Sequence, residues 1–349
     1  MIIVLGGGAQ FYTNQQVDRV LQKFPYSLDN QLSLNVTENA KNFFSRELTF
    51  SLENNDGQKT NIISTKLTAL PFFITAESKL SEQLVRQLNK DLNITIDKNT
   101  INSKFSPVGD YLQSNILTDF RDFTNKTQAL SVTLDFNAGT KNVAFNANLS
   151  GFNYDKNSKL EQIHAQIKLV PVGENQYDIS TLELNAKNAE WDLLNGENTK
   201  IQLKNARYQF GVKKSADTDL RDLSTQLSSD TLRIANKERT TEESQTVING
   251  MMLNLQQQGV TSAVDFANEF KKQLNGEQNI KHVANFLAAV LTQNHTFNGT
   301  LSVKSVDAPK NQKPYFNLNE AKLNLTMANA DLAKANLTLQ LNAASIKQT

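Results

Sequence analysis

Apolar and polar positions repeat with two different periods along this chain, and the period indicates the kind of element. Near the N-terminus the apolar residues fall at helical spacing, at Val17, Val20, Leu21 and Phe24. We therefore expect a short helix over residues 11–24, ended by Pro25. A hairpin is expected next, because a stretch that alternates from Arg46 onward leads through the turn sequence Asn54–Gly57 into a second alternating stretch.

Four later segments carry apolar residues at helical spacing and predict two pairs of helices. These segments are residues 78–92 and 106–123 for the first pair and residues 261–274 and 279–294 for the second. In the segment 106–123, Ser106 is placed to cap a helix and Pro107 to occupy its first position. The face of this helix would be formed by Leu112, Ile116, Phe120 and Phe123.

Between residues 129 and 235 the apolar period changes to two, which is typical of half-buried strands. The alternation is regular around the turn at Gly139 and shows parity slips in residues 180–194 and 199–212. Further strands are expected at 297–306, 315–327 and 335–343. Strands in blocks and helices in pairs favour an α+β fold: an extended antiparallel β-sheet body of long amphipathic strands, packed by two pairs of helices, with a short N-terminal helix.

Four regions follow from this order of elements. Residues 1–10 would be the remnant of a membrane anchor or signal segment, because Met1–Leu5 is apolar but too short to span a bilayer. A helix, hairpin and helix pair would occupy 11–128, antiparallel strands 129–235, and a second helix pair with strands 236–349. One continuous domain is the alternative to the last three regions.

The amino-acid composition excludes several kinds of functional site. The 349 residues include no cysteine, which excludes disulfides, thiolate metal sites and thiol nucleophiles. Lys and Arg number 36 and Asp and Glu 35, so the net charge of +1 gives no electrostatic reason to expect a nucleic-acid partner.

Candidate catalytic groups are scattered. The three histidines, His164, His282 and His295, form no ligand pair, so a zinc site would need all three to converge or carboxylates to complete it. The glycine-rich Val4–Gln10 lacks the residues of a phosphate-binding loop. Acidic pairs, such as Asp119 with Asp122 and Glu242 with Glu243, are expected by chance, and Trp191 fits an inward-facing sheet position. We therefore assign no catalytic residue, no metal and no cofactor.

The opening stretch, "GGGAQFYTNQQVDRVL", resembles the junction between membrane helix and body in the YdgA-like family of Gram-negative envelope proteins, at Gly7, Gly8, Ala9, Tyr12 and Thr13. The stretch "NFFSRELTFSLE" and the amphipathic strands of "LEQIHAQIKLVPV" and "ISTLELNAKNAEWDLL" are similar to it as well. The resemblance implies a periplasmic body tethered to the inner membrane. It carries no agreed activity, so it implies no functional residue.

These patterns favour a non-catalytic envelope protein that binds a lipid or another envelope protein. The reason is the repeated strands with one continuous apolar face, which helices, a second sheet or an apolar ligand must cover. Two alternatives stay open. One is an envelope hydrolase that uses dispersed carboxylates, and the other is a structural module whose sheet edges pair with a partner chain. A membrane anchor is expected only if the chain continues upstream of Met1.

Overall fold

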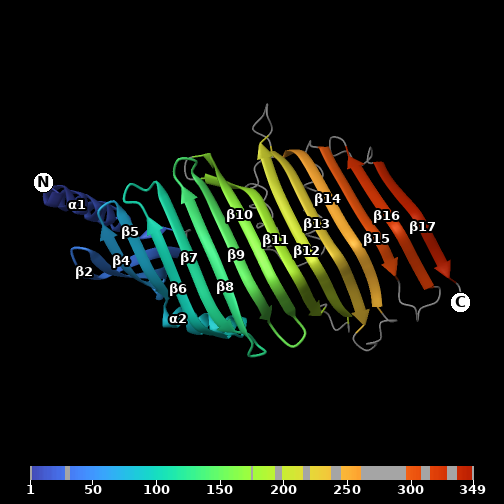
Figure 1. Cartoon of the computed structure of the whole chain (residues 1–349), viewed down its shortest axis with the longest axis horizontal. Coiled ribbons are helices and arrows are strands. Elements are labelled where there is room, and N and C mark those ends of the chain that lie inside the picture. Colours follow the sequence, from blue (N-terminus) through green and yellow to red (C-terminus); the bar gives the residue numbers. More distant parts are fainter. Residues whose placement is uncertain are drawn as a thin grey trace. The chain divides into compact units, whose positions relative to one another are not determined.

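Antiparallel strands dominate the structure, a computed structural model of the chain (Figure 1). It describes residues 2–27, 32–173, 176–192, 199–214, 221–236, 245–260, 296–307, 315–327 and 336–347. Among the described residues, 75% lie in strands and 10% in helices, which contradicts the expected α+β fold with two pairs of helices. Within the described residues the helices are α1 (Ile2–Leu21) and α2 (Glu82–Leu92).

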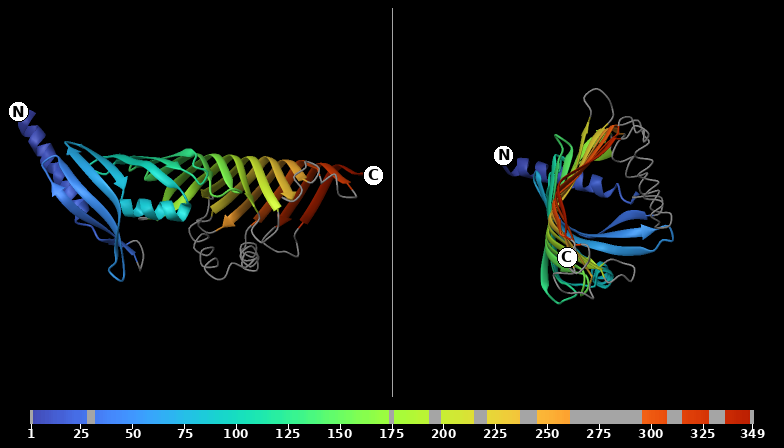
Figure 2. Two further views of the ribbon diagram at one scale, coloured as in Figure 1. Left: turned by 90° about the horizontal axis from the view of Figure 1, so that it is seen from below. Right: turned by 90° about the vertical axis from the view of Figure 1, so that its right-hand side faces the viewer.

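The first unit, Met1–Lys156, is an antiparallel meander in which each strand pairs with the next one along the chain. Its strands are β1 (Tyr26–Ser27), β2 (Leu32–Lys41), β3 (Ser45–Asn54), β4 (Lys59–Leu70), β5 (Phe73–Leu80), β6 (Thr95–Phe105), β7 (Tyr111–Arg121), β8 (Thr127–Asn137) and β9 (Asn142–Asn153). The predicted β3–β4 hairpin is confirmed. A helix is also present at the N-terminus, but α1 begins at Ile2 and ends at Leu21, whereas the sequence predicts a helix over residues 11–24. In Figure 2, α1 extends beyond the strands toward the N-terminus.

The second unit, Asn157–Thr349, is also an antiparallel meander. Its strands are β10 (Lys159–Gly173), β11 (Gln176–Asp192), β12 (Thr199–Lys214), β13 (Arg221–Asn236), β14 (Gln245–Val260), β15 (Thr296–Asp307), β16 (Tyr315–Met327) and β17 (Asn336–Lys347). Strand β14 was not predicted from the sequence. The predicted helices at 261–274 and 279–294 lie outside the described residues.

The predicted helix over residues 106–123 is wrong, because this segment forms a turn followed by β7. Its apolar residues Leu112, Ile116 and Phe120 recur every four positions, and four is a multiple of the strand period as well as close to one helical turn. Ser114, between two of them, faces Ser103 of β6 with their hydroxyl oxygens 2.8 Å apart. Ser106 belongs to the turn, where Gly109 has φ +78° and donates its N–H to Ser106 O.

The predicted helix over residues 78–92 is partly right. Residues up to Leu80 belong to β5, and α2 begins after its N-cap, Ser81, whose hydroxyl oxygen accepts the N–H of Leu84. At the other end Asn93 adopts a left-handed conformation, which ends the helix.

The core of the first unit lies between α1 and the sheet. Its buried members are Val17, Leu48, Leu67, Ala69 and Ile74, and Leu21, Val36, Phe50 and Phe105 pack against them. Strand register places apolar residues of β4 to β8 in one transverse row, which consists of Ala69, Ile74, Phe105, Leu112 and Phe136. One face of this sheet is therefore apolar over at least five strands.

In the second unit, a line of left-handed residues crosses the sheet. Positive φ angles occur at Gln162, Asn205, Gly250 and Glu320, which lie on β10, β12, β14 and β16. The strand register places them in a single transverse line, with Lys187, Asp230 and Lys304 opposite them on the strands between. We call this line, defined by these seven residues, the crease.

The crease accounts for the parity slips in the sequence. In β12 the apolar residues Leu203 and Tyr208 are an odd number of positions apart, so a regular strand would place them on opposite faces. Asn205 lies between them, and a left-handed residue interrupts the alternation, as it does in a β-bulge. The apolar positions on its two sides can thus share one face of the sheet.

Candidate functional site

An apolar cavity of about 550 Å³ lies between the C-terminal half of α1 and the sheet of the first unit. This volume is within the range of about 300–1,000 Å³ that is typical of small-molecule sites. The side chains and backbone that line it belong to Gln16, Val17, Val20, Leu21, Phe24, Leu48, Phe50, Leu67, Ile74, Phe105, Ser106, Pro107, Val108, Gly109, Tyr111, Leu112 and Phe136.

The floor of the cavity is part of the protein core, whereas its mouth is exposed. Ile74 in the floor is only 2% exposed, and Leu48 beside it is equally buried. At the mouth, Val108 of the β6–β7 turn is 63% exposed, and Val20 of α1 is exposed as well. The apolar side chains at the opening of the cavity are therefore exposed to water.

The chemistry of the lining is that of an apolar binding site. Among the described residues that line the cavity, none is acidic, basic or a histidine. Ser106 is buried, and its hydroxyl oxygen accepts the N–H of Val108 within the turn. The cavity can therefore hold an uncharged apolar group, but its lining offers no acid–base pair for hydrolysis.

An ion pair fixes α1 above the cavity. The Arg46 side chain, 1% exposed, donates from Nη1 to Asp18 Oδ1 of α1 at 2.6 Å and to Glu38 Oε1 of β2 at 3.0 Å. Its Nη2 donates to the carbonyl oxygen of Asn14 at 3.3 Å. The hydrogen bond from Arg46 is the main reason that the pKa of Asp18 lies below its usual value. A buried cation thus holds the helix that supplies one wall of the cavity.

Hydrogen bonds tie the middle of α1 to two hairpin tips. Gln10 Nε2 donates to the carbonyl oxygen of Ala69 at 2.7 Å and to that of Phe43 at 3.2 Å. Thr13 is fully buried, and its hydroxyl oxygen accepts the N–H of Phe72 at 3.2 Å. Thr13 is one of the residues on which the family resemblance rests, and its position here is a structural one.

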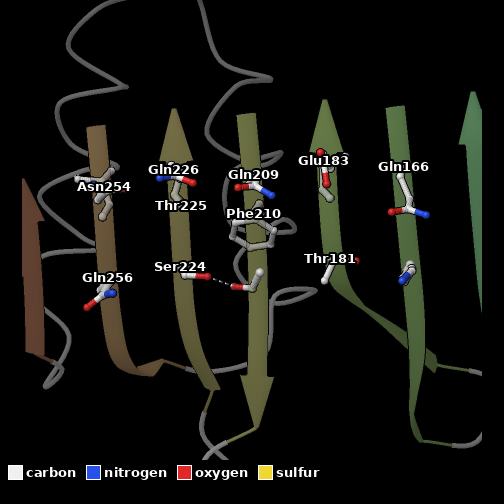
Figure 3. Close-up of a pocket in the computed structure, with 14 residues that line it drawn as sticks. Gln166, Thr181, Glu183, Gln209, Phe210, Ser224, Thr225, Gln226, Asn254 and Gln256 are labelled. Carbon is white, nitrogen blue, oxygen red and sulfur yellow. Dashed lines mark hydrogen bonds between the residues drawn. The ribbon is translucent and has the colours of Figure 1, made fainter. Parts of the chain in front are cut away.

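A second hollow, of about 490 Å³, lies on the polar face of the second unit (Figure 3). Amide and carboxylate side chains line up across five strands there, in a row of Gln166, Glu183, Gln209, Gln226 and Asn254. Gly211 also lines the hollow, and Ser224 Oγ donates to its carbonyl oxygen at 3.4 Å. Glu183 has its pKa lowered by hydrogen bonding to Asn185 and by Arg207, so it is a paired anion rather than an acid catalyst.

The second unit also has an apolar face. In register across β10 to β16 runs a row of Ala165, Leu184, Tyr208, Leu227, Leu253, Leu301 and Leu323. Leu184 and Leu301 in this row are exposed. Burial among these neighbours raises the pKa of Tyr208, although a hydrogen bond to Thr225 partly opposes the effect.

The candidate chemical groups do not converge. His164 lies on β10 opposite Asn185, and His282, His295, Glu242 and Glu243 fall outside the described residues. Trp191 lies on β11 opposite Ile201 and is half-buried. In the described ranges no three His, Asp or Glu side chains are grouped to hold a metal ion.

Asp122 is the most strongly shifted of the acidic candidates, and its role is to organise a turn. Burial opposes its ionisation, yet hydrogen bonds from Thr124, Gln128 and Asn153 outweigh this and lower the pKa to about 2. Its oxygens also accept the backbone N–H groups of Thr124 and Lys126. A carboxylate held this firmly in its ionised form cannot serve as a general acid near neutral pH.

The apolar helix face that forms one wall of the cavity is predicted by the sequence, but the cavity itself is not. The lining also includes Tyr111 and Leu112, which belong to the segment 106–123 that the sequence predicts as a helix. The available signal was the exposed-turn sequence around Gly109 between two alternating stretches.

Within the described residues, neither helix is long and apolar enough to cross a membrane. Comparison of the chain with protein-family models, with curated proteins and with solved structures finds no match.

Proposed function

We propose that the protein is a non-catalytic lipid-binding protein of the bacterial cell envelope, and that the cavity under α1 takes an acyl chain. The observation that carries this proposal is the combination of a buried apolar floor at Ile74 with an exposed apolar mouth at Val108 and Val20. Following the family resemblance, we place the body in the periplasm, tethered to the inner membrane.

The physical basis is the match between the lining and an acyl chain. A hydrocarbon chain has no hydrogen-bonding groups, so it loses nothing when it enters a cavity that offers none. Each apolar Å² that the chain and the lining remove from water contributes about 25 cal/mol. A polar headgroup would remain outside, beside Gln16 and Tyr111 at the mouth.

The apolar row of the second unit supports the same class of ligand. Exposed leucines within a cross-strand row, such as Leu184 and Leu301, form a surface that an apolar molecule can cover. The hydrolase alternative gains no comparable support. Among the described carboxyl groups, each one with a shifted pKa has it lowered, at Asp18, Asp122, Glu183 and Glu190.

The test is binding of a dansylated undecanoic acid, whose fluorescence rises in apolar surroundings, to the delipidated full chain. Val108→Asp and Val20→Asp place a charge at the mouth from two different elements, and both side chains are exposed in the folded protein. Each variant should bind the probe at least about tenfold more weakly, because an acyl chain beside an ionised carboxylate desolvates it.

Leu117→Asp is the matched control, since Leu117 is an exposed apolar residue of the same unit that does not line the cavity. It should bind the probe as the unaltered chain does. Probe binding that is absent from the unaltered chain, or equal in all four proteins, would rule out the cavity as an acyl-chain site.

A further inference from the structure

Six aromatic side chains and one leucine are exposed on the segments of the first unit where α1 is hydrogen-bonded to two hairpin tips. We call this group the aromatic collar; it consists of Phe11, Tyr12, Phe43, Phe44, Leu70, Phe72 and Phe73. Phe11 and Phe72 are each 68% exposed. Two collar residues lie on α1, two at the β2–β3 tip and three at the β4–β5 tip.

Interactions within the chain hold the collar together. The two hairpin tips are joined by a hydrogen bond from Ala69 N–H to Phe44 O at 2.8 Å. Gln10 bonds to both tips, and Asn14 Nδ2 donates to Phe43 O at 3.0 Å. The rings of Phe43 and Phe44 meet edge to face, with centroids 4.7 Å apart. The collar is thus a preorganised surface rather than a set of independent loose side chains.

Phe72 is held outward in an unfavourable backbone conformation. Its φ of +65° lies in the left-handed region, which bulky residues avoid and in which a turn would favour Gly or Asn. The bond from Phe72 N–H to Thr13 Oγ1 fixes this conformation. The ring is exposed, so no packing inside the protein offsets the cost of this backbone conformation. Such uncompensated strain is typical of functional positions.

We propose that the aromatic collar seats the first unit on the surface of a phospholipid bilayer, with its rings at the depth of the headgroups. Aromatic side chains are enriched at that depth, and exposed apolar patches mark membrane or protein contact sites. In α1 the collar residues Phe11 and Tyr12 follow the apolar sequence Ile2–Leu5 within about two helical turns, separated from it by Gly6–Gln10.

The hydrogen bonding of the collar favours a bilayer over a protein partner. Protein interfaces of ordinary size carry about ten direct hydrogen bonds. Here the carbonyl groups of Phe43, Phe44 and Ala69 and the N–H of Phe72 already bond within the chain. No collar residue is charged. The surface therefore offers rings and few directional groups, which suits lipid headgroups and acyl ends.

Flotation of the full chain with vesicles of phosphatidylethanolamine and phosphatidylglycerol tests this proposal. The variant Phe11→Ser/Phe43→Ser/Phe72→Ser should partition to vesicles at least about tenfold more weakly, since burial of even one Phe is worth more than that factor. The control Leu117→Ser/Phe123→Ser/Tyr154→Ser removes three other exposed apolar side chains of the same unit and should partition normally. Residues 1–5 are unchanged in both, so the difference reports the collar.

A single-site probe keeps the proposal testable if the triple variant does not fold. With Trp191, the only tryptophan, replaced by Phe, Phe72→Trp should be quenched by brominated phospholipid and Leu117→Trp should not. Equal partitioning of both triple variants, or no quenching at position 72 in bound protein, would overturn the proposal. Collar-dependent self-association without vesicle binding would overturn it in favour of a protein interface. Val108→Asp should leave flotation unchanged, so failure of this proposal and failure of the acyl-chain site remain distinguishable.

Discussion

Arg46 Nη1 lies 2.6 Å from Asp18 Oδ1, and this contact joins strand β3 to helix α1 beside the apolar cavity. The arginine is buried, whereas the aspartate is partly exposed and is also bound by Lys41. The pair therefore combines a desolvated cation with an anion that water still reaches. The ion pair holds α1 in place, and α1 supplies Val17, Val20 and Leu21 to the cavity.

Replacement of Arg46 by Ala should destabilise the first unit. The change leaves Asp18 and Glu38 without their buried cation and removes a side chain from the interior. We expect a loss of about 1–3 kcal/mol in the free energy of unfolding, measured by urea denaturation. Lys41→Ala removes the exposed partner of the same aspartate and should cost less than about 1 kcal/mol. Equal losses in the two variants would show that the burial of Arg46 is unimportant.

Asp122 should make stability depend on acid pH. Its pKa in the folded protein, about 2, lies below the ordinary value of 3.8, so its stabilising effect is present above pH 4 and is lost as pH falls toward 2. Asp122→Asn should thus be less stable than the unaltered chain at pH 7, and the difference should shrink between about pH 4 and pH 2. Urea denaturation at a series of pH values measures it. Asp56→Asn, which changes a carboxylate in an exposed turn, is the control and should leave the free energy of unfolding at pH 7 nearly unchanged.

A side chain in place of Gly250 at the crease should destabilise the second unit. Its φ is +59°, and an added Cβ would lie 2.5 Å from Lys304 Cγ on the neighbouring strand. Gly250→Ala should therefore lower the free energy of unfolding by about 1–3 kcal/mol. Combining it with Lys304→Ala removes the two closest atoms, Cγ and Cδ, but leaves Lys304 Cβ at 3.1 Å and the backbone strain, so the double variant should recover part of the loss. Full additivity of the two changes would contradict a contact across the crease.

The sequence predicted the strands best where alternation was unbroken, as around Val132 and Phe145. It failed at residues 106–123, since a spacing of four residues fits both a helix face and every second inward position of a strand. The inward-facing Ser114 fits a strand better than a helix, because it pairs with Ser103 on the neighbouring strand. That pairing depends on tertiary structure. Local patterns could not reveal it.

The crease and the cavity show a similar limit. Parity slips near Asn205 were visible in the sequence, but their alignment across seven strands depends on the register of every strand pair. The cavity depends on how α1 crosses the sheet, and the buried Arg46 is one of the residues that hold the helix there. A charged residue in an alternating stretch gives no sign of being buried until its partners are known.

The proposal that the cavity under α1 holds an acyl chain can be tested directly by native mass spectrometry. The sample is the full chain purified from a bacterial periplasm. We expect an additional mass equal to a phospholipid or fatty acid on the unaltered chain and on Leu117→Asp, and its loss on Val108→Asp. A bare polypeptide mass for the unaltered chain, or a lipid adduct that Val108→Asp retains undiminished, would contradict the account.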